Sequence, residues 1–308
     1  MSFIIENPYY RATPSQNLPD LFCDNPLPNL DEFIGSKQDK LIIFEPWEAD
    51  IPGPVMKSGK TVIECITDQL KNIDTKNVTF ITPNLDCNSV PFADKVLHYP
   101  YHFLDIQKKQ DNLTGMTFAR KKHFCSFNGA IKHKRIKFIK FCEEHDLIKD
   151  NYVSLVGTYD HGFKTDEKVN LYTLDKSADE VRADDKSVPL DIMKDSFLNI
   201  INETHEDEHV FFTEKTWKPI LNFQIFLYYG VSDPSRYYEE LQNMGFQLYT
   251  EIIDYNNDPL QELLKFTKLT ISEIQQKISP SKLMNNRRLA ESINCNDIKT
   301  SLLYGKSI

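Results

Sequence analysis

The stretch "SFLNIINETHEDEHVFFTEKTWKPILNFQIFLYYG" (residues 196–230) contains two apolar runs on either side of a polar segment. The runs "SFLNII" and "QIFLYYG" are rich in aromatic and β-branched residues, which is typical of buried strands. Between them, "TEKTWKPILNF" predicts a turn and a short helix that Thr213 can cap. Pro219 should disturb a regular helix, so we expect one turn, a kink and then the strand.

The same alternation extends outward along the chain. The patterns predict strands at 40–44, 77–83, 94–100, 123–127 and 152–157, and helices at 58–73, 132–148, 233–245 and from 258 onward. Repeated Pro and Asn in the first forty residues predict irregular or short-helical cover, and residues 107–122 are a candidate linker. Ser58 and Asp233 are candidate caps, with Pro234 at a first helical position and Gly245 at a helix end.

Strands that alternate with helices in two sets predict an α/β fold with mainly parallel sheets. We expect an N-terminal α/β domain over residues 1–115, a C-terminal α/β domain over 120–290 and a tail over 291–308. Sheets of this kind bind ligands beyond the carboxyl ends of their strands.

The composition excludes several classes of protein. The chain has 308 residues, of which 40% are hydrophobic and 26% charged, and no apolar run approaches the roughly 18 residues of a membrane span. The start lacks a basic segment followed by an apolar core, so we expect no secretory signal. Six scattered cysteines without a C-x-x-C pattern predict a reducing cytoplasm. The net charge of −9 argues against a mainly electrostatic nucleic-acid binder.

Three short motifs resemble known phosphate- or metal-binding patterns but do not match them. "GPVMKSGKT" (53–61) has five residues between its glycines where a P-loop has four, which favours a capped helix start. "HEDEH" (205–209) follows a strand and predicts a solvated loop, because zinc-binding His pairs need a rigid helix and a third ligand. "RADD" (182–185) lies in polar loop sequence and is interpreted as surface. We therefore expect no metal site.

The basic run "ARKKHF…KHKRIKFIK" (119–140) has two interpretations. It can contact nucleic acid, or it can be an ordinary helix face whose charges point into water.

The segment "FTEKTWKP" is the strongest candidate site. A helix N-terminus carries about half a positive charge, so Lys215 in its first turn is unfavourable by a few tenths of a kcal/mol. A bound phosphate would reverse that sign by accepting hydrogen bonds from the backbone amides and pairing with Lys215. The carboxylate of Glu214 can accept two hydrogen bonds from a ribose diol. The alternative is a surface turn with Trp217 packed on the core.

These residues resemble a known family. "LNIINE…VFFTEKTWKPILNFQIFLYYG" is similar to the donor-site segment of glycosyltransferase family 10, the α-1,3-fucosyltransferases, and of their phage and bacterial relatives. Looser similarity extends to "VLHYPYHFLD" (96–105) and "HFCSFNGAIKHKRIKFIKFCEEH" (123–145), so the resemblance covers about half of the chain. It implies a GT-B-like architecture, in which two Rossmann-like domains with mainly parallel sheets face each other across a cleft.

The resemblance also implies a reaction. A sugar would move from a GDP- or UDP-linked nucleotide-sugar donor to a hydroxyl acceptor without an obligatory metal or other cofactor. Our hypothesis is an inverting displacement, and the sequence leaves open whether the anomeric configuration is inverted or retained. Arg135 and Lys215 would hold the diphosphate, Glu214 the ribose, and Glu203 and Thr213 would belong to the donor site.

The acceptor side of the resemblance is carried by "FEPWEAD" (44–50). Glu45 or Glu48 would be the catalytic base, with Asp50 behind it. The local pattern of this acidic loop differs from the family's, and the family's T-E-K segment lacks the proline of "TEKTWKP". These differences leave the sugar open, fucose included.

Two alternatives stay open. The first is a phage-type transferase that glycosylates modified bases in DNA through the 119–140 region, although a glycan is favoured over DNA as acceptor. The second is a non-catalytic protein that binds nucleotides or carbohydrates.

Overall fold

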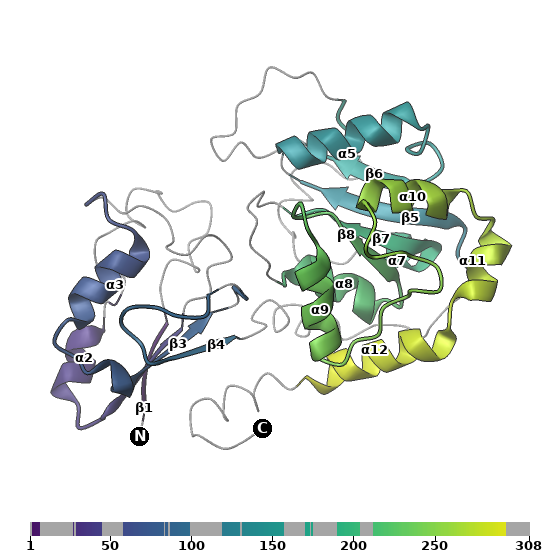
Figure 1. Ribbon diagram of the computed structural model, residues 1–308. Coiled ribbons are helices and arrows are strands. Elements are labelled where there is room, and N and C mark those ends of the chain that lie inside the picture. The colour runs from purple at the N-terminus through teal and green to yellow at the C-terminus, as the bar shows by residue number, and fades with distance from the viewer. Residues whose placement is uncertain are drawn as a thin grey trace. The chain divides into compact units, whose positions relative to one another are not determined.

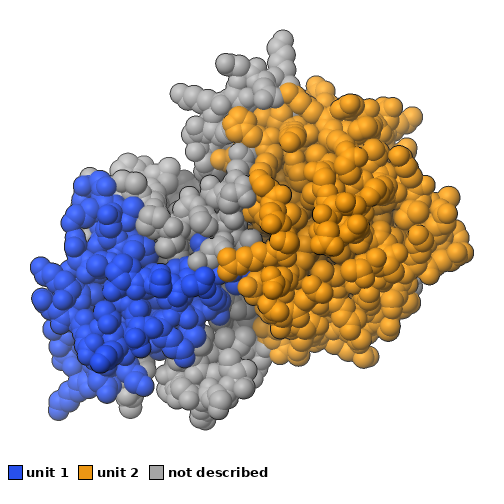
Figure 2. Space-filling view, in the orientation of Figure 1, with its two compact units in different colours: residues 1–101, 209–212, 294–308 blue, residues 102–208, 213–293 orange. Residues whose placement is uncertain are grey.

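The computed structural model describes residues 2–6, 27, 29–44, 58–82, 84–85, 87–98, 119–129, 131–156, 170–172, 174, 190–203 and 212–293. The chain forms two compact units (Figure 2): unit 1 comprises residues 1–101, 209–212 and 294–308, and unit 2 comprises residues 102–208 and 213–293. Each unit contains one four-stranded sheet whose strands pair in parallel. The predicted α/β class with parallel sheets is therefore confirmed.

The sheet of unit 1 has the order β1 (Ser2–Glu6), β2 (Lys40–Phe44), β3 (Val78–Thr82) and β4 (Lys95–His98). The last three strands were predicted. The expectation of irregular or short-helical cover for the first forty residues was wrong at β1, although a short helix, α2 (Leu30–Gly35), also lies there. The strand "SFIIE" is short, and it pairs with β2, which lies far away along the chain. The pattern of Pro and Asn residues near the strand does not predict such a long-range pairing.

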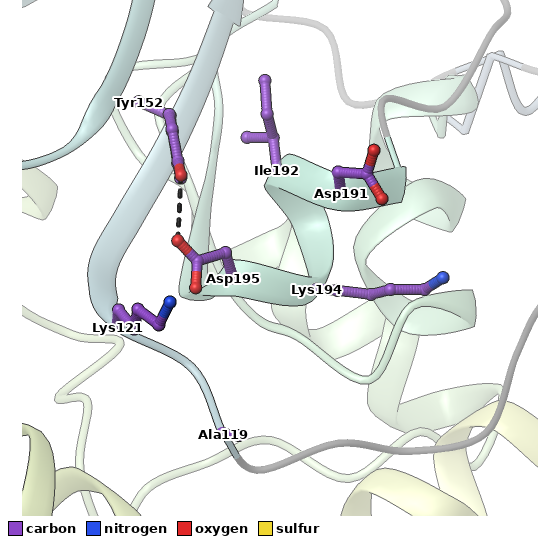
Figure 3. A pocket seen from close by; sticks show the side chains of 7 residues that line it. All are labelled: Ala119, Lys121, Tyr152, Asp191, Ile192, Lys194 and Asp195. Carbon is purple, nitrogen blue, oxygen red and sulfur yellow. Dashed lines mark hydrogen bonds between the residues drawn. The ribbon is translucent and has the colours of Figure 1, made fainter.

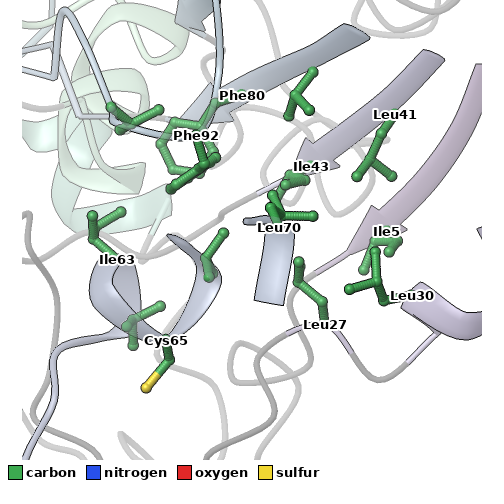
Figure 4. Packing of buried hydrophobic residues seen from close by; sticks show 14 of the residues in the cluster. Ile5, Leu27, Leu30, Leu41, Ile43, Ile63, Cys65, Leu70, Phe80 and Phe92 are labelled. Carbon is green, nitrogen blue, oxygen red and sulfur yellow. The ribbon is translucent and has the colours of Figure 1, made fainter. Parts of the chain in front are cut away.

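A hydrophobic cluster packs unit 1 together (Figure 4). Side chains of the strands, such as Ile43 and Phe80, meet Ile66 and Leu70 of helix α3 (Val62–Leu70), and Phe80 packs edge-on against Phe92 with ring centroids 5.3 Å apart. Burial of this apolar surface is the main force that holds the helix on the sheet.

Helix α3 begins later than predicted. Its N-cap is Thr61 and not Ser58. The Thr61 hydroxyl accepts from the Glu64 amide at 3.3 Å, and the Glu64 carboxylate accepts from the Thr61 amide at 2.7 Å. This reciprocal capping box satisfies two backbone donors at once, which a serine cap alone does not do.

The sheet of unit 2 has the order β6 (Tyr152–Leu155), β5 (Lys122–Asn128), β7 (Ser196–Ile201) and β8 (Ile225–Tyr228), all of which were predicted. Every residue of β7 and β8 is buried, as expected for parallel strands that helices cover on both faces. Figure 1 shows α5 (His133–Glu144) and α10 (Pro259–Thr267) on one side of this sheet, and α8 (Glu214–Leu221) and α12 (Pro280–Ser292) on the other.

Helix α8 differs from its prediction. Thr213 is the N-cap, as expected, and its hydroxyl accepts from the Lys215 amide at 3.1 Å. The helix nevertheless continues through Pro219 to Leu221 and does not end after one turn, as had been predicted. A proline inside a helix removes one backbone hydrogen bond. Here burial of Trp217, Ile220 and Leu221, each no more than 2% exposed, outweighs that loss.

The remaining helices of unit 2 agree with their predictions in part. α7 (Leu190–Asp195), which precedes β7, was not predicted. α9 (Ser235–Asn243) begins one residue later than expected, because Pro234 is the N-cap and not the first helical residue, and Gly245 follows its end with a φ of 93°. Asp258 caps α10, and a capping box of Thr270 with Glu273 opens α11 (Ile271–Lys277). Within the described ranges, no helix is both long and apolar enough to cross a membrane.

Candidate functional site

The predicted donor-site residues gather where the strands of unit 2 end. β5 ends at Asn128, β7 is followed by Asn202 and Glu203, and β8 ends at Tyr228. All four residues are no more than 2% exposed. We call this region, together with the first turns of α5 and α8 beside it, the carboxyl edge. Open parallel α/β sheets bind their ligands at such edges.

Lys215 lies between two carboxylates at the start of α8. Its Nζ is 3.0 Å from Glu203 Oε2 and 3.2 Å from Glu214 Oε1, and its side chain is 22% exposed. The Thr213 hydroxyl donates to Glu203 Oε1 at 2.6 Å. Glu203 and Glu214 are therefore anionic partners of Lys215 within the protein, whereas the sequence analysis expected a bound phosphate as its partner. A bound phosphate would have to take the place of a carboxylate at Lys215.

Arg135 reaches the same point from the other side of the sheet. It lies in the first turn of α5, is 2% exposed, and donates from Nη2 to the carbonyl oxygen of Asn202 at 3.1 Å. Two cations from different helices thus contact consecutive residues after β7. The structure brings five predicted site residues together in this way: Arg135, Glu203, Thr213, Glu214 and Lys215. The predicted base, Glu45 or Glu48, and Asp50 lie outside the described residues.

The first turn of α5 carries more positive charge than the first turn of α8. The N-cap is Lys132, which makes no side-chain capping hydrogen bond, and the first turn has His133, Lys134 and Arg135 but no acidic residue. Lys134 Nζ donates to the carbonyl of Gly230 at 2.6 Å, so this turn extends to the loop after β8. Because a helix N-terminus already attracts anions, cations gathered there make α5 the stronger candidate for a phosphate site.

Sequence reasoning did not single out this helix start as a candidate site. It assigned only Arg135 to the donor site, through the family resemblance, and interpreted the rest of "KHKR" as part of a basic surface run. The available signal was the run of basic residues at the expected beginning of a helix, where acidic residues are usual.

Two stacked tyrosines line one side of the carboxyl edge. The rings of Tyr228 and Tyr237 are parallel within 15° with centroids 3.9 Å apart, and the Tyr237 hydroxyl donates to Thr216 at 2.9 Å. Burial raises the pKa of both hydroxyls well above the usual value, and the nearby carboxylate of Glu203 adds to the rise. Both phenols are therefore neutral at physiological pH and can act as hydrogen-bonding groups but not as bases.

Gly230 is required by the close approach of the Tyr228 ring. A Cβ added at Gly230 would overlap the Cζ and hydroxyl of Tyr228. We expect Gly230→Ala to lower the free energy of unfolding by about 1–3 kcal/mol, because the buried ring must shift. Urea denaturation measures this. Gly129→Ala is the control, since a Cβ there meets no atom within 4 Å. Equal stability of the two variants would contradict the proposed overlap.

A polar hollow lies at the opposite end of the strands (Figure 3). Its volume is about 370 Å³, and residues near the starts of β5, β6 and β7 line it: Ala119, Lys121, Tyr152, Asp191, Ile192, Lys194 and Asp195. The Tyr152 hydroxyl donates to Asp195 at 2.9 Å, which raises the pKa of the tyrosine. The hollow contains none of the predicted site residues, and its charges are mixed.

Grouped metal ligands and exposed cysteines are absent among the described residues. No three His, Cys, Asp or Glu side chains in this part of the chain are grouped as metal ligands, and the motifs "HEDEH" and "RADD" fall outside it. Cys65, Cys87, Cys125 and Cys142 are free and buried. Burial raises the pKa of the Cys87 thiol to about 11 and that of Cys142 to about 12, so neither is a nucleophile at neutral pH.

Comparison of the chain with models of protein families, with curated proteins and with solved structures finds no match. The class of protein is thus defined by the fold, as an α/β protein with two parallel sheets.

Proposed function

We propose that this protein is a glycosyltransferase of GT-B architecture that moves a sugar from a nucleotide-sugar donor to a hydroxyl acceptor. One observation carries the proposal: Arg135 and Lys215 contact consecutive buried residues at the carboxyl edge, beside the cationic first turn of α5. A parallel sheet with this arrangement fits an anionic ligand that also has uncharged parts, as nucleotide sugars do.

In this proposal the diphosphate binds at the start of α5. The backbone amides of the first turn and the guanidinium of Arg135 donate to its oxygens. Lys215 turns from Glu203 and Glu214 toward the diphosphate, and Glu214 then accepts hydrogen bonds from the ribose diol. Thr213 continues to donate to Glu203, which keeps that buried carboxylate hydrogen-bonded.

The chemical step follows from the charges. The acceptor oxygen forms a bond to the anomeric carbon as the bond from that carbon to the diphosphate breaks, so negative charge grows on the leaving oxygens. Arg135, Lys215 and the α5 amides stabilise that charge. A carboxylate takes the proton of the acceptor hydroxyl, and Glu45 or Glu48 is proposed for this role. The product configuration would be inverted, and no metal takes part.

DNA is disfavoured as the acceptor because several cations of the 119–140 run are occupied within the protein. Arg120 is 4% exposed and donates to four backbone carbonyls. Arg135 and Lys134 donate to backbone carbonyls at the carboxyl edge. Lys137 and Lys140 remain exposed on α5. A glycan acceptor is therefore proposed, and salt-dependent retention on DNA would support the alternative.

A thermal-shift screen tests the proposal. UDP, GDP, dTDP, CMP and their sugar conjugates are added to the full-length protein, and a ligand at 100 times its dissociation constant should add about 2.7 kcal/mol to the free energy of unfolding. Release of free sugar from the bound donor then separates an enzyme from a non-catalytic binder. If no nucleotide or nucleotide sugar raises the melting temperature, the proposal is wrong.

A further inference from the structure

Three neighbouring strands of unit 2 end in side chains with buried, unpaired polar atoms. In the order of the sheet these atoms are Oδ1 of Asn128 at the end of β5, both amide atoms of Asn202 directly after β7, and the hydroxyl of Tyr228 at the end of β8. Each residue is 1% exposed, and none of these atoms has a hydrogen-bond partner among the described residues.

The register of the strands places these atoms at one edge. β5 pairs with β7 through Cys125 and Asn199, and continuing that register by three residues brings Asn128 level with Asn202. Tyr228 pairs with Ile201, the residue before Asn202, so its side chain leaves the opposite face of the pleat at the same edge. Arg135 donates to the carbonyl of Asn202, so Asn202 adjoins the proposed phosphate site.

Polar side chains elsewhere in the same sheet are satisfied. At the amino ends, the Asn151 side chain accepts from the Phe124 amide at 3.1 Å, and the Ser196 hydroxyl donates to Ile192 at 2.9 Å. Gln224, directly before β8, donates to Ser196 and accepts from Asn199. Since native proteins pair nearly all buried polar atoms, a row of unpaired ones at a single edge indicates a missing partner.

We propose that Asn128, Asn202 and Tyr228 bind the uncharged part of the ligand, a group that carries hydroxyls or N–H donors. The inference rests on the proposed function, whose anionic contacts lie beside these residues. It assigns specificity to three side chains that were not among the predicted site residues.

The types of unpaired atom define the chemistry. The amide oxygens of Asn128 and Asn202 only accept hydrogen bonds, so the ligand must bring at least two donors. A phosphate at neutral pH brings acceptors and cannot satisfy them. Asn202 Nδ2 and the Tyr228 hydroxyl can donate, so the ligand must accept as well. Sugar hydroxyls and the N–H and C=O groups of a nucleobase share this property.

Two substitutions remove the unpaired atoms with little change of shape. Tyr228→Phe deletes one hydroxyl, and Asn202→Leu replaces an amide by an apolar side chain of similar size. Because the deleted atoms have no protein partner, both variants should melt at the wild-type temperature or higher. Their affinity for the nucleotide sugar found in the thermal-shift screen should fall about three- to tenfold for Tyr228→Phe, and more than tenfold for Asn202→Leu.

Tyr238→Phe is the matched control. The Tyr238 hydroxyl accepts from the backbone amide of Tyr228 at 2.8 Å, so its loss leaves a buried donor unpaired. This variant should melt below the wild type, in contrast to Tyr228→Phe. Lower melting temperatures for both Tyr228→Phe and Asn202→Leu would overturn the inference, because the deleted atoms would then have partners within the protein.

Isothermal titration calorimetry with inorganic pyrophosphate, the nucleoside diphosphate and the nucleotide sugar shows whether these three side chains contact the nucleoside or the sugar. Inorganic pyrophosphate should bind the wild type and both variants equally. Weaker binding of the nucleoside diphosphate as well as the nucleotide sugar would assign the row to the nucleoside, and weaker binding of the nucleotide sugar alone would assign it to the sugar. If the wild type and both variants bind the nucleotide sugar equally, the inference fails and the proposed function survives. If the wild type binds no nucleotide sugar, both fail.

Discussion

Replacing Lys215 by alanine is expected to lower the rate of sugar transfer about 100- to 1,000-fold while unit 2 stays folded, because a preorganised cation that meets charge developing in the transition state is worth that much. Lys215 is 22% exposed and pairs with Glu203 and Glu214. After its loss, Glu203 still accepts from Thr213 at 2.6 Å, so we expect the fold to persist. Steady-state kinetics with the donor found by thermal shift measure the rate, and circular dichroism measures the fold.

Lys265→Ala is the matched control for this experiment. Lys265 also pairs with a buried carboxylate, that of Glu262 at 2.5 Å, but on α10 and outside the carboxyl edge. Its loss should leave the rate of transfer unchanged. Lys215→Ala with a rate within threefold of the wild type would show that Lys215 does not hold the donor. Arg135→Ala should also lose turnover, and Arg135→Lys should recover part of it, because lysine keeps the charge but not the forked geometry.

Replacing Arg120 by methionine is expected to lower the free energy of unfolding by about 4 kcal/mol or more. The guanidinium donates from Nη1 to the carbonyls of Met193 (2.6 Å) and Ser196, and from Nη2 to those of Asn222 (3.0 Å) and Phe223 (2.9 Å). Burial lowers the pKa of Arg120 to about 10, which still leaves it charged at pH 7. Its loss would leave several buried acceptors unpaired at once.

Chemical denaturation measures the effect of Arg120→Met. Arg120→Lys should be intermediate, because an ammonium group cannot match a planar fork to four carbonyls. Arg236→Met is the control: Arg236 lies 4.0 Å from Glu240 with a side chain 39% exposed, and such surface pairs contribute about 0–1 kcal/mol. If Arg120→Met and the wild type unfold at the same denaturant concentration, the four backbone carbonyls must have other hydrogen-bond partners.

The candidate site was predictable only in part. Thr213 as a helix cap followed from the local pattern, and the expectation of a partner for Lys215 followed from the helix dipole. That the partner is Glu203 did not follow, because twelve residues separate the two along the chain. The basic residues at the start of α5 are evident in the sequence, but they were interpreted as part of a basic surface. Its meaning depends on Asn202 and Gly230, which fold beside it from distant parts of the sequence.

The sequence by itself determined the class of fold and most helices and strands, because apolar periodicity and capping residues act within a few neighbours along the chain. Only the tertiary structure decided the rest. β1 pairs with a strand nearly forty residues away, and α8 continues through Pro219 because its apolar face is buried. Arg120, which the sequence places in a polar linker, is buried because carbonyls 73–103 residues away converge on it. Such contacts depend on which strands lie side by side, and no local pattern encodes that order.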